Sequence, residues 1–163
     1  MSEYSVSCNS IYHIDIIGET LEEKSIEQGD LKEYTKELIK ETLLKNGYSV
    51  DMYRIGGSGQ VPDPSEYDIV FLGTFTWGKG NIPDEVKDFV WEIHYKPDNI
   101  VVFGTGDTQF GGDDLFCYAA VQLARFYNSK VECLKIEQSP RGHQEEKVIK
   151  WTEGVIAKWK DLK

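Results

Sequence analysis

Two continuous apolar segments constrain the fold more than any other feature of this sequence. Tyr67 to Gly73 reads Tyr-Asp-Ile-Val-Phe-Leu-Gly, and Asn99 to Gly104 reads Asn-Ile-Val-Val-Phe-Gly. Neither core alternates apolar with polar residues, so both segments are typical of strands that are covered on two faces. Such strands are usually parallel, and parallel strands are joined by helical crossovers. We therefore expect an α/β protein with helices on both faces of its sheet.

Three further segments are predicted strands because they are short and rich in β-branched or alternating apolar residues. They are Ile11 to Ile17, Tyr48 to Ile55 and Lys130 to Ile136, and Tyr4 to Cys8 competes for the place of the first. The stretch from Gly56 to Ser65 is rich in Gly and Pro, which predicts a loop.

Four helices are predicted between and after these strands. The first runs from Asp30 to Asn46, with Asp30 as N-cap, Leu38 and either Leu43 or Leu44 on its apolar face, and Gly47 as its stop. Pro83 to Tyr95 begins with Pro-Asp-Glu, as helices often do. Leu115 to Tyr127 is apolar nearly all round and predicts a buried helix. The last helix carries one apolar stripe, made of Val148, Trp151, Val155, Trp159 and Leu162.

The composition narrows the class of protein. The 163 residues predict one domain, residues 1–163, and 28 acidic against 18 basic side chains give a net charge of −10. This excess repels nucleic acid and favours basic protein partners. Three widely spaced cysteines and three scattered histidines show no disulfide or metal-ligand pattern. Without an export signal or a membrane-spanning run, a cytoplasmic protein is expected.

Two loops are expected to carry the chemistry, because ligands of open parallel sheets bind at the carboxyl ends of strands. The loop after Gly73 reads Thr-Phe-Thr-Trp-Gly-Lys-Gly-Asn-Ile-Pro, and the loop after Gly104 reads Thr-Gly-Asp-Thr-Gln-Phe-Gly-Gly. Each holds Gly, hydroxyl residues and a large aromatic, Trp77 or Phe110. Two aromatic rings on neighbouring loops can enclose a flat ring, while glycine lets the backbone approach its edge.

These residues carry a resemblance to a known family. Thr-Trp-Gly-x-Gly-x-x-Pro, beginning at Thr76, is followed by Phe-Gly-x-Gly-Asp from Phe103 and by Phe-Cys at Cys117, and the order and spacing resemble those of short-chain flavodoxins. The resemblance runs from about Tyr48 to the C-terminus. It implies a flavodoxin-like three-layer sandwich, whose five-stranded parallel sheet has the order 2-1-3-4-5.

The resemblance also implies a bound FMN and a role for each matching residue. It places Trp77 and Phe110 on the two faces of the flavin ring, and Gly78 at the peptide that turns toward the ring on reduction. Backbone groups at the pyrimidine edge are implied at Thr105, Gly106 and Asp107. Thr74, Phe75 and Thr76 are implied on the phosphate side, and Cys117 near the flavin edge.

The phosphate loop departs from the family pattern of Thr/Ser-x-Thr-Gly-x-Thr. At the corresponding place this chain reads Ser25-Ile-Glu-Gln-Gly-Asp-Leu, in which only Gly29 matches. Ser25, Gln28 and the backbone of Gly29 are candidates for an improvised phosphate site. Residues 7–10, with two serines and an asparagine, are the alternative if the first strand lies earlier.

Three functions are compatible with these residues. The resemblance implies a one-electron carrier rather than an enzyme, passing electrons from a flavodoxin reductase-type protein to acceptor enzymes through an acidic face. An activator of a ribonucleotide reductase metallocofactor is an alternative, which Lys79 in place of the family's usual acid favours. A binding or regulatory protein that has lost FMN is another, which the unusual phosphate loop favours.

Overall fold

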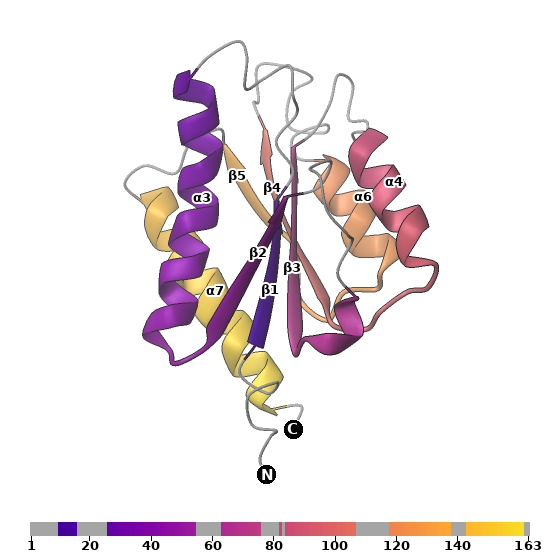
Figure 1. Ribbon diagram of the computed structural model, residues 1–163. Helices are drawn as coiled ribbons and strands as arrows, with labels where there is room; N and C mark the ends of the chain where they lie inside the picture. Colours follow the sequence, from indigo (N-terminus) through magenta and orange to yellow (C-terminus); the bar gives the residue numbers. More distant parts are fainter. Residues whose placement is uncertain are drawn as a thin grey trace.

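The computed structural model describes residues 10–15, 26–54, 63–75, 82, 84–106, 118–137 and 143–161, and all structural statements below concern these residues. The strands are β1 (Ser10–Asp15), β2 (Ser49–Arg54), β3 (Ile69–Phe75), β4 (Ile100–Gly106) and β5 (Leu134–Glu137). The helices are α3 (Ile26–Lys45), α4 (Asp84–Ile93), α6 (Tyr118–Phe126) and α7 (His143–Asp161), with a short 3₁₀ helix, η1, at Pro64–Glu66 (Figure 1).

The five strands form one parallel sheet in the order β2-β1-β3-β4-β5. The α/β class and the parallel sheet expected from the sequence are thereby confirmed. The two apolar segments form β3 and β4, which pair with each other, and residues 69–74 and 100–104 are buried. Of the two candidates for the first strand, residues 10–15 form β1, while Tyr4 to Cys8 lies outside the described residues.

Helices cover both faces of the sheet, α3 and α7 one face and α4 and α6 the other (Figure 1). Successive residues of β3 and β4 point alternately into the two core layers on either side of the sheet, because side chains along a strand alternate between its faces. The layer under α3 and α7 contains Ile69, Phe71, Val101 and Phe103, together with Ile39, Leu43, Val148 and Val155. The layer under α4 and α6 contains Val70, Leu72, Ile100 and Val102, together with Val86, Phe89, Ala120 and Leu123.

The carboxyl end of α3 resolves a choice that the sequence left open. Leu43 is buried, whereas Leu44 is 50% exposed, so Leu43 belongs to the apolar face. Gly47 ends the helix as expected. Its φ of +86° is accessible to glycine at little cost, and the N–H of Tyr48 then donates to the carbonyl of Leu43.

Three predicted elements differ from the structure in extent or exposure. The strand expected from Lys130 begins only at Leu134, because the preceding residues form the connection from α6. The helix expected to be apolar all round is amphipathic, since Phe126 is 42% exposed beneath the ammonium of Lys96, 4.2 Å from the ring centroid. The loop expected to extend to Ser65 includes the first two residues of η1.

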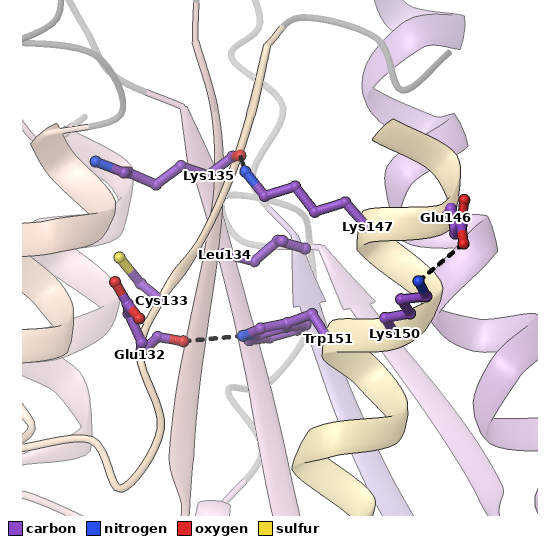
Figure 2. A pocket seen from close by; sticks show the side chains of 8 residues that line it. All are labelled: Glu132, Cys133, Leu134, Lys135, Glu146, Lys147, Lys150 and Trp151. Carbon is purple, nitrogen blue, oxygen red and sulfur yellow. Dashed lines mark hydrogen bonds and ion pairs between the residues drawn. The ribbon is translucent and has the colours of Figure 1, made fainter. Parts of the chain in front are cut away.

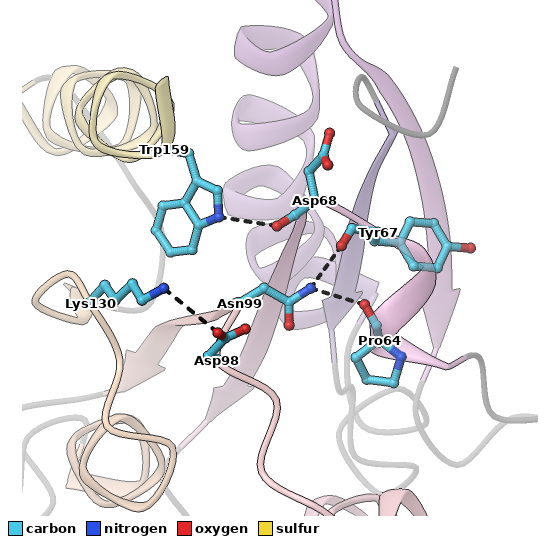
Figure 3. Close-up of polar contacts among 7 residues, drawn as sticks. All are labelled: Pro64, Tyr67, Asp68, Asp98, Asn99, Lys130 and Trp159. Atoms are coloured by element: carbon cyan, nitrogen blue, oxygen red, sulfur yellow. Dashed lines mark hydrogen bonds and ion pairs between the residues drawn. The ribbon is translucent and has the colours of Figure 1, made fainter. Parts of the chain in front are cut away.

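Polar side chains fasten the amino end of the sheet (Figure 3). The amide Nδ2 of Asn99 donates to the carbonyls of Pro64 and Tyr67, at 2.9 and 2.8 Å. The indole Nε1 of Trp159, on α7, donates to the carbonyl of Asp68 at 3.1 Å. These contacts join the segments that lead into β3 and β4 to each other and to α7. The amino end of the sheet is therefore held in place, and the carboxyl end extends from it.

The buried Tyr127 is expected to make the stability of the fold depend on pH. It is 4% exposed, its hydroxyl has no partner among the described residues, and burial raises its pKa to about 12 from 10.0. Below pH 10 the tyrosine is neutral in both states. Above pH 10 the tyrosine ionises in the unfolded state but not in the folded one, and this stabilises the unfolded state. The free energy of unfolding therefore falls by up to about 1.4 kcal/mol per pH unit until about pH 12.

Urea unfolding of the protein and of Tyr127→Phe between pH 8 and 11.5 measures this contribution. The variant lacks the titrating group, so the difference in unfolding free energy between the two proteins is expected to change steadily above pH 10. Parallel pH profiles of the two proteins would contradict the assignment.

Within the described parts of the chain, no helix is both long enough and apolar enough to cross a membrane.

Candidate functional site

Four of the predicted site residues lie side by side at the carboxyl ends of β3 and β4. Thr74 and Phe75 end β3, while Thr105 and Gly106 end β4. In the parallel register Phe75 pairs with Thr105, and Thr74 pairs with Gly104. Neighbouring strands lie about 4.8 Å apart, so the loops that leave these two strand ends begin next to each other. The sheet thus brings together the starting points of the two predicted chemical loops.

The structure corrects the boundary between strand and loop at both places. The sequence suggested that the strands end at Gly73 and Gly104, but pairing continues through Phe75 and Gly106. Gly73 is instead a packing position. A Cβ atom built on it would lie 2.3 Å from Cζ of Phe103, so the absence of a side chain makes room for that ring. Thr74, Phe75, Thr105 and Gly106 are therefore held by the sheet rather than by loops.

Thr74, implied by the resemblance on the phosphate side, is buried at the end of β3. Its side chain is only 3% exposed. Thr74 is therefore enclosed by the fold at this strand end.

The other predicted flavin-binding residues that follow these strand ends lie outside the described residues. They are Thr76, Trp77, Gly78, Asp107, Phe110 and Cys117. The aromatic enclosure of a flat ring by Trp77 and Phe110 therefore stays a prediction from the sequence. What the structure contributes is the common origin of their two loops at adjacent strand ends.

The amino end of α3 is the third part of the candidate site, and the structure corrects its position. The helix begins at Ile26, so Asp30 lies within the helix rather than at its N-cap. Gln28 and Gly29 fall in the first turn, and Ser25 precedes the helix, outside the described residues. Because α3 follows β1 and precedes the parallel β2, its first turn lies at the same edge as the strand ends (Figure 1). The first four N–H groups of a helix lack helical acceptors and favour an anion.

No group of three or more His, Cys, Asp or Glu side chains is arranged to hold a metal ion within the ranges that the structure describes. Cys133 is a half-buried free thiol, and desolvation raises its pKa. A raised pKa keeps the sulfur protonated and reduces its reactivity as a nucleophile.

A hollow of about 610 Å³ lies between β5 and α7 (Figure 2). It was not predicted from the sequence, which identified Trp151 only as part of an apolar stripe. The indole Nε1 of Trp151 donates to the carbonyl of Glu132 at 2.9 Å, and Nζ of Lys147 donates to the carbonyl of Lys135 at 3.0 Å. These hydrogen bonds join α7 to β5 and to the segment just before it.

Comparisons with known proteins agree with this arrangement. A family model described as "Flavodoxin" matches residues 28–151. The "Probable flavodoxin 1" of Bacillus subtilis (strain 168) is 31% identical over 134 residues, covering 76% of this chain and 81% of that protein. The "Probable flavodoxin 2" of the same strain is 37% identical over 93 residues, covering 52% of this chain and 60% of that protein.

The match to Probable flavodoxin 2 thus covers less than two thirds of the length of that protein. Among solved structures, a flavodoxin of Streptococcus pneumonia TIGR4 has a TM-score of 0.71 and 24% identity, covering 91% of this chain and 99% of its own. This likeness establishes the common fold.

Proposed function

The chain belongs to the flavodoxin family, and from this premise we propose that it binds FMN and carries single electrons from a reductase to acceptor enzymes. The observation that supports the proposal most directly is the pairing of Phe75 with Thr105. Because of this pairing, the loops that contain Trp77 and Phe110 begin on neighbouring strands. They leave the sheet at its carboxyl edge, where ligands of parallel sheets bind.

The residues that the sequence supplies for this edge are chemically suited to a flavin. Indole and phenyl rings can cover the faces of an isoalloxazine and exclude water from it. The backbone of Thr105, Gly106 and Asp107 supplies amide groups for a heteroaromatic edge, and Gly78 supplies a peptide that can reorient at low cost. Bound FMN supplies the one-electron chemistry, while the protein orients the ring and sets its environment.

The FMN phosphate is proposed to bind at the first turn of α3, despite the unusual loop. Free N–H groups and the positive end of the macrodipole favour an anion there, whichever side chains surround it. Ser25, Gln28 and Gly29 are the candidates of this turn. Since the usual hydroxyl-rich loop is missing from the sequence, backbone groups are expected to provide most of the phosphate affinity.

Titration of the purified chain with FMN and with riboflavin tests the proposal. We expect the flavin absorption spectrum to shift on binding, and FMN to bind about threefold to thirtyfold more tightly than riboflavin, the range given by a partly exposed helix-terminus contact. Equal affinities would overturn the phosphate site, and failure to bind either flavin would overturn the carrier function.

A pair of tryptophan variants locates the flavin. Trp77→Ala is expected to weaken FMN binding about tenfold to a hundredfold, because ring stacking is lost. Trp91→Ala removes a tryptophan that is 80% exposed on α4, and it is expected to leave the FMN affinity unchanged. Equal losses in the two variants would speak against the ring enclosure.

A further inference from the structure

The outer face of α4 carries a tryptophan that the fold does not use. Val86, Phe89 and Ile93 point into the core and are at most 7% exposed. Trp91 lies on the opposite side of the helix and is 80% exposed, the most exposed of the large apolar side chains described. An indole contributes to stability by burial, and this one is almost fully in water.

Three carboxylates lie on the same exposed side of α4 as Trp91. Asp84, Asp88 and Glu92 follow the spacing i, i+4, i+8, and all three are exposed. No ion pair neutralises any of them within the described residues, where Lys87 is the one basic residue of the helix. We call Asp84, Asp88, Trp91 and Glu92 the Trp91 face.

Helix stability does not explain this set of residues. Asp84 stabilises the amino end of α4 through the macrodipole, but Glu92 stands in the last turn, where an acid is unfavourable. That turn holds no basic residue. Like charges at a spacing of four residues also repel each other slightly. Solubility alone would be served better by a polar residue than by an exposed indole.

We propose that the Trp91 face docks a partner protein through an arginine or lysine that lies on the indole ring of Trp91, with the flanking carboxylates around it. A cation over the face of an indole is the strongest of the exposed cation–π pairs, and tryptophan is enriched among residues that dominate interfaces. Charge complementarity identifies the partner as basic. A second copy of this chain is disfavoured, since each carries a net charge of −10 and the same acidic face.

The position of this face relates it to the carrier function, on which the inference rests. α4 follows β3, so its first residue, Asp84, lies at the carboxyl edge of the sheet, whereas Trp91 lies seven residues further along the helix, about 10 Å nearer to the amino edge. A basic redox partner on this face would therefore contact α4 from the carboxyl edge, where FMN is proposed to lie, toward the amino edge. The face itself needs no flavin to bind.

The full chain labelled with ¹⁵N, titrated with an arginine–glycine repeat peptide, tests the proposal with and without FMN. The indole N–H signals of Trp151 and Trp159 serve as internal controls, because both groups donate to carbonyls inside the molecule. We expect the Trp91 signal, assigned with Trp91→Phe, to shift with saturation while those two stay in place. Binding by the flavin-free chain separates this test from that of electron carriage.

Two charge reversals of equal size test whether peptide binding depends on the Trp91 face or only on the net charge of the protein. Glu92→Lys is expected to weaken peptide binding about threefold to tenfold, as expected for the loss of exposed charge contacts. Glu153→Lys, on the exposed side of α7, is expected to change it less than about twofold. Equal effects of the two variants, or a Trp91 signal that does not move, would overturn the proposal.

Discussion

Replacing Gly73 with alanine is expected to lower the free energy of unfolding by about 1–3 kcal/mol, the usual cost of overpacking a core. The new Cβ would lie 2.3 Å from Cζ and 2.7 Å from Cε2 of Phe103, well inside van der Waals contact. Phe103 is 2% exposed, so its ring cannot move aside into solvent. Urea denaturation of the variant measures the loss.

Two companion variants make the result specific. Gly154→Ala, in the interior of α7, meets no heavy atom within 4 Å and should stabilise the protein by about 0.5–1 kcal/mol through helix propensity. Phe103→Leu in the Gly73→Ala background should recover part of the loss, because the clashing ring is gone. Additive effects at the two positions would contradict direct contact as the cause. Since Gly73 precedes Thr74, the single variant should also weaken any flavin binding at this strand end.

Truncating Phe71 to alanine is expected to cost about 3–5 kcal/mol, a large share of the stability of an ordinary domain. Phe71 is fully buried in the layer under α3 and α7. Its ring meets that of Trp151 edge to face, with centroids 5.9 Å apart and planes inclined by 81°. The variant therefore leaves a cavity and also removes a contact that holds α7. Denaturant unfolding and thermal melting both report the effect.

Phe126→Ala is the matched control for this truncation. It removes the same side chain, but from a site that is 42% exposed, so about 1 kcal/mol or less is expected. Phe71→Leu, which preserves most of the volume, should cost under about 1.5 kcal/mol and keeps the comparison open if the alanine variant does not fold. Similar losses at Phe71 and Phe126 would show that burial does not determine the cost.

The type of each element could be predicted from the sequence because periodicity reports burial directly. The unbroken apolar runs ending near Gly73 and Gly104 indicated strands covered on two faces, and the structure buries both. The stripe on α7 likewise placed Val148, Val155 and Trp159 in the core. In these cases the local pattern and the tertiary environment require the same residue types.

The ends of elements were harder to predict, because several local signals are compatible with more than one boundary. Asp30 has the right chemistry for an N-cap, yet α3 begins at Ile26, since helix extension gains hydrogen bonds that outweigh one glycine at position 29. Gly73 suggested a turn, whereas its role is to accommodate Phe103, thirty positions along the chain. A contact between distant residues leaves no periodic signal in either segment.

The candidate site could be predicted only as a meeting of two loops. Their origin on adjacent strands follows from the parallel topology, which the apolar runs indicated. The deep burial of Thr74 could not be read from the sequence, because it depends on how the neighbouring strands and helices enclose that position. The Trp91 face was readable in principle from its spacing, but only the exposed fraction shows that nothing covers the indole.

The attachment of α7 to β5 has a consequence for the behaviour of the protein at high concentration. Trp151 and Lys147 donate to two main-chain carbonyls, of Glu132 just before the edge strand β5 and of Lys135 within it. Exposed strand borders recruit neighbouring polypeptides and promote aggregation. Because side chains of α7 already donate hydrogen bonds to these two carbonyls, a neighbouring polypeptide finds fewer free main-chain acceptors there.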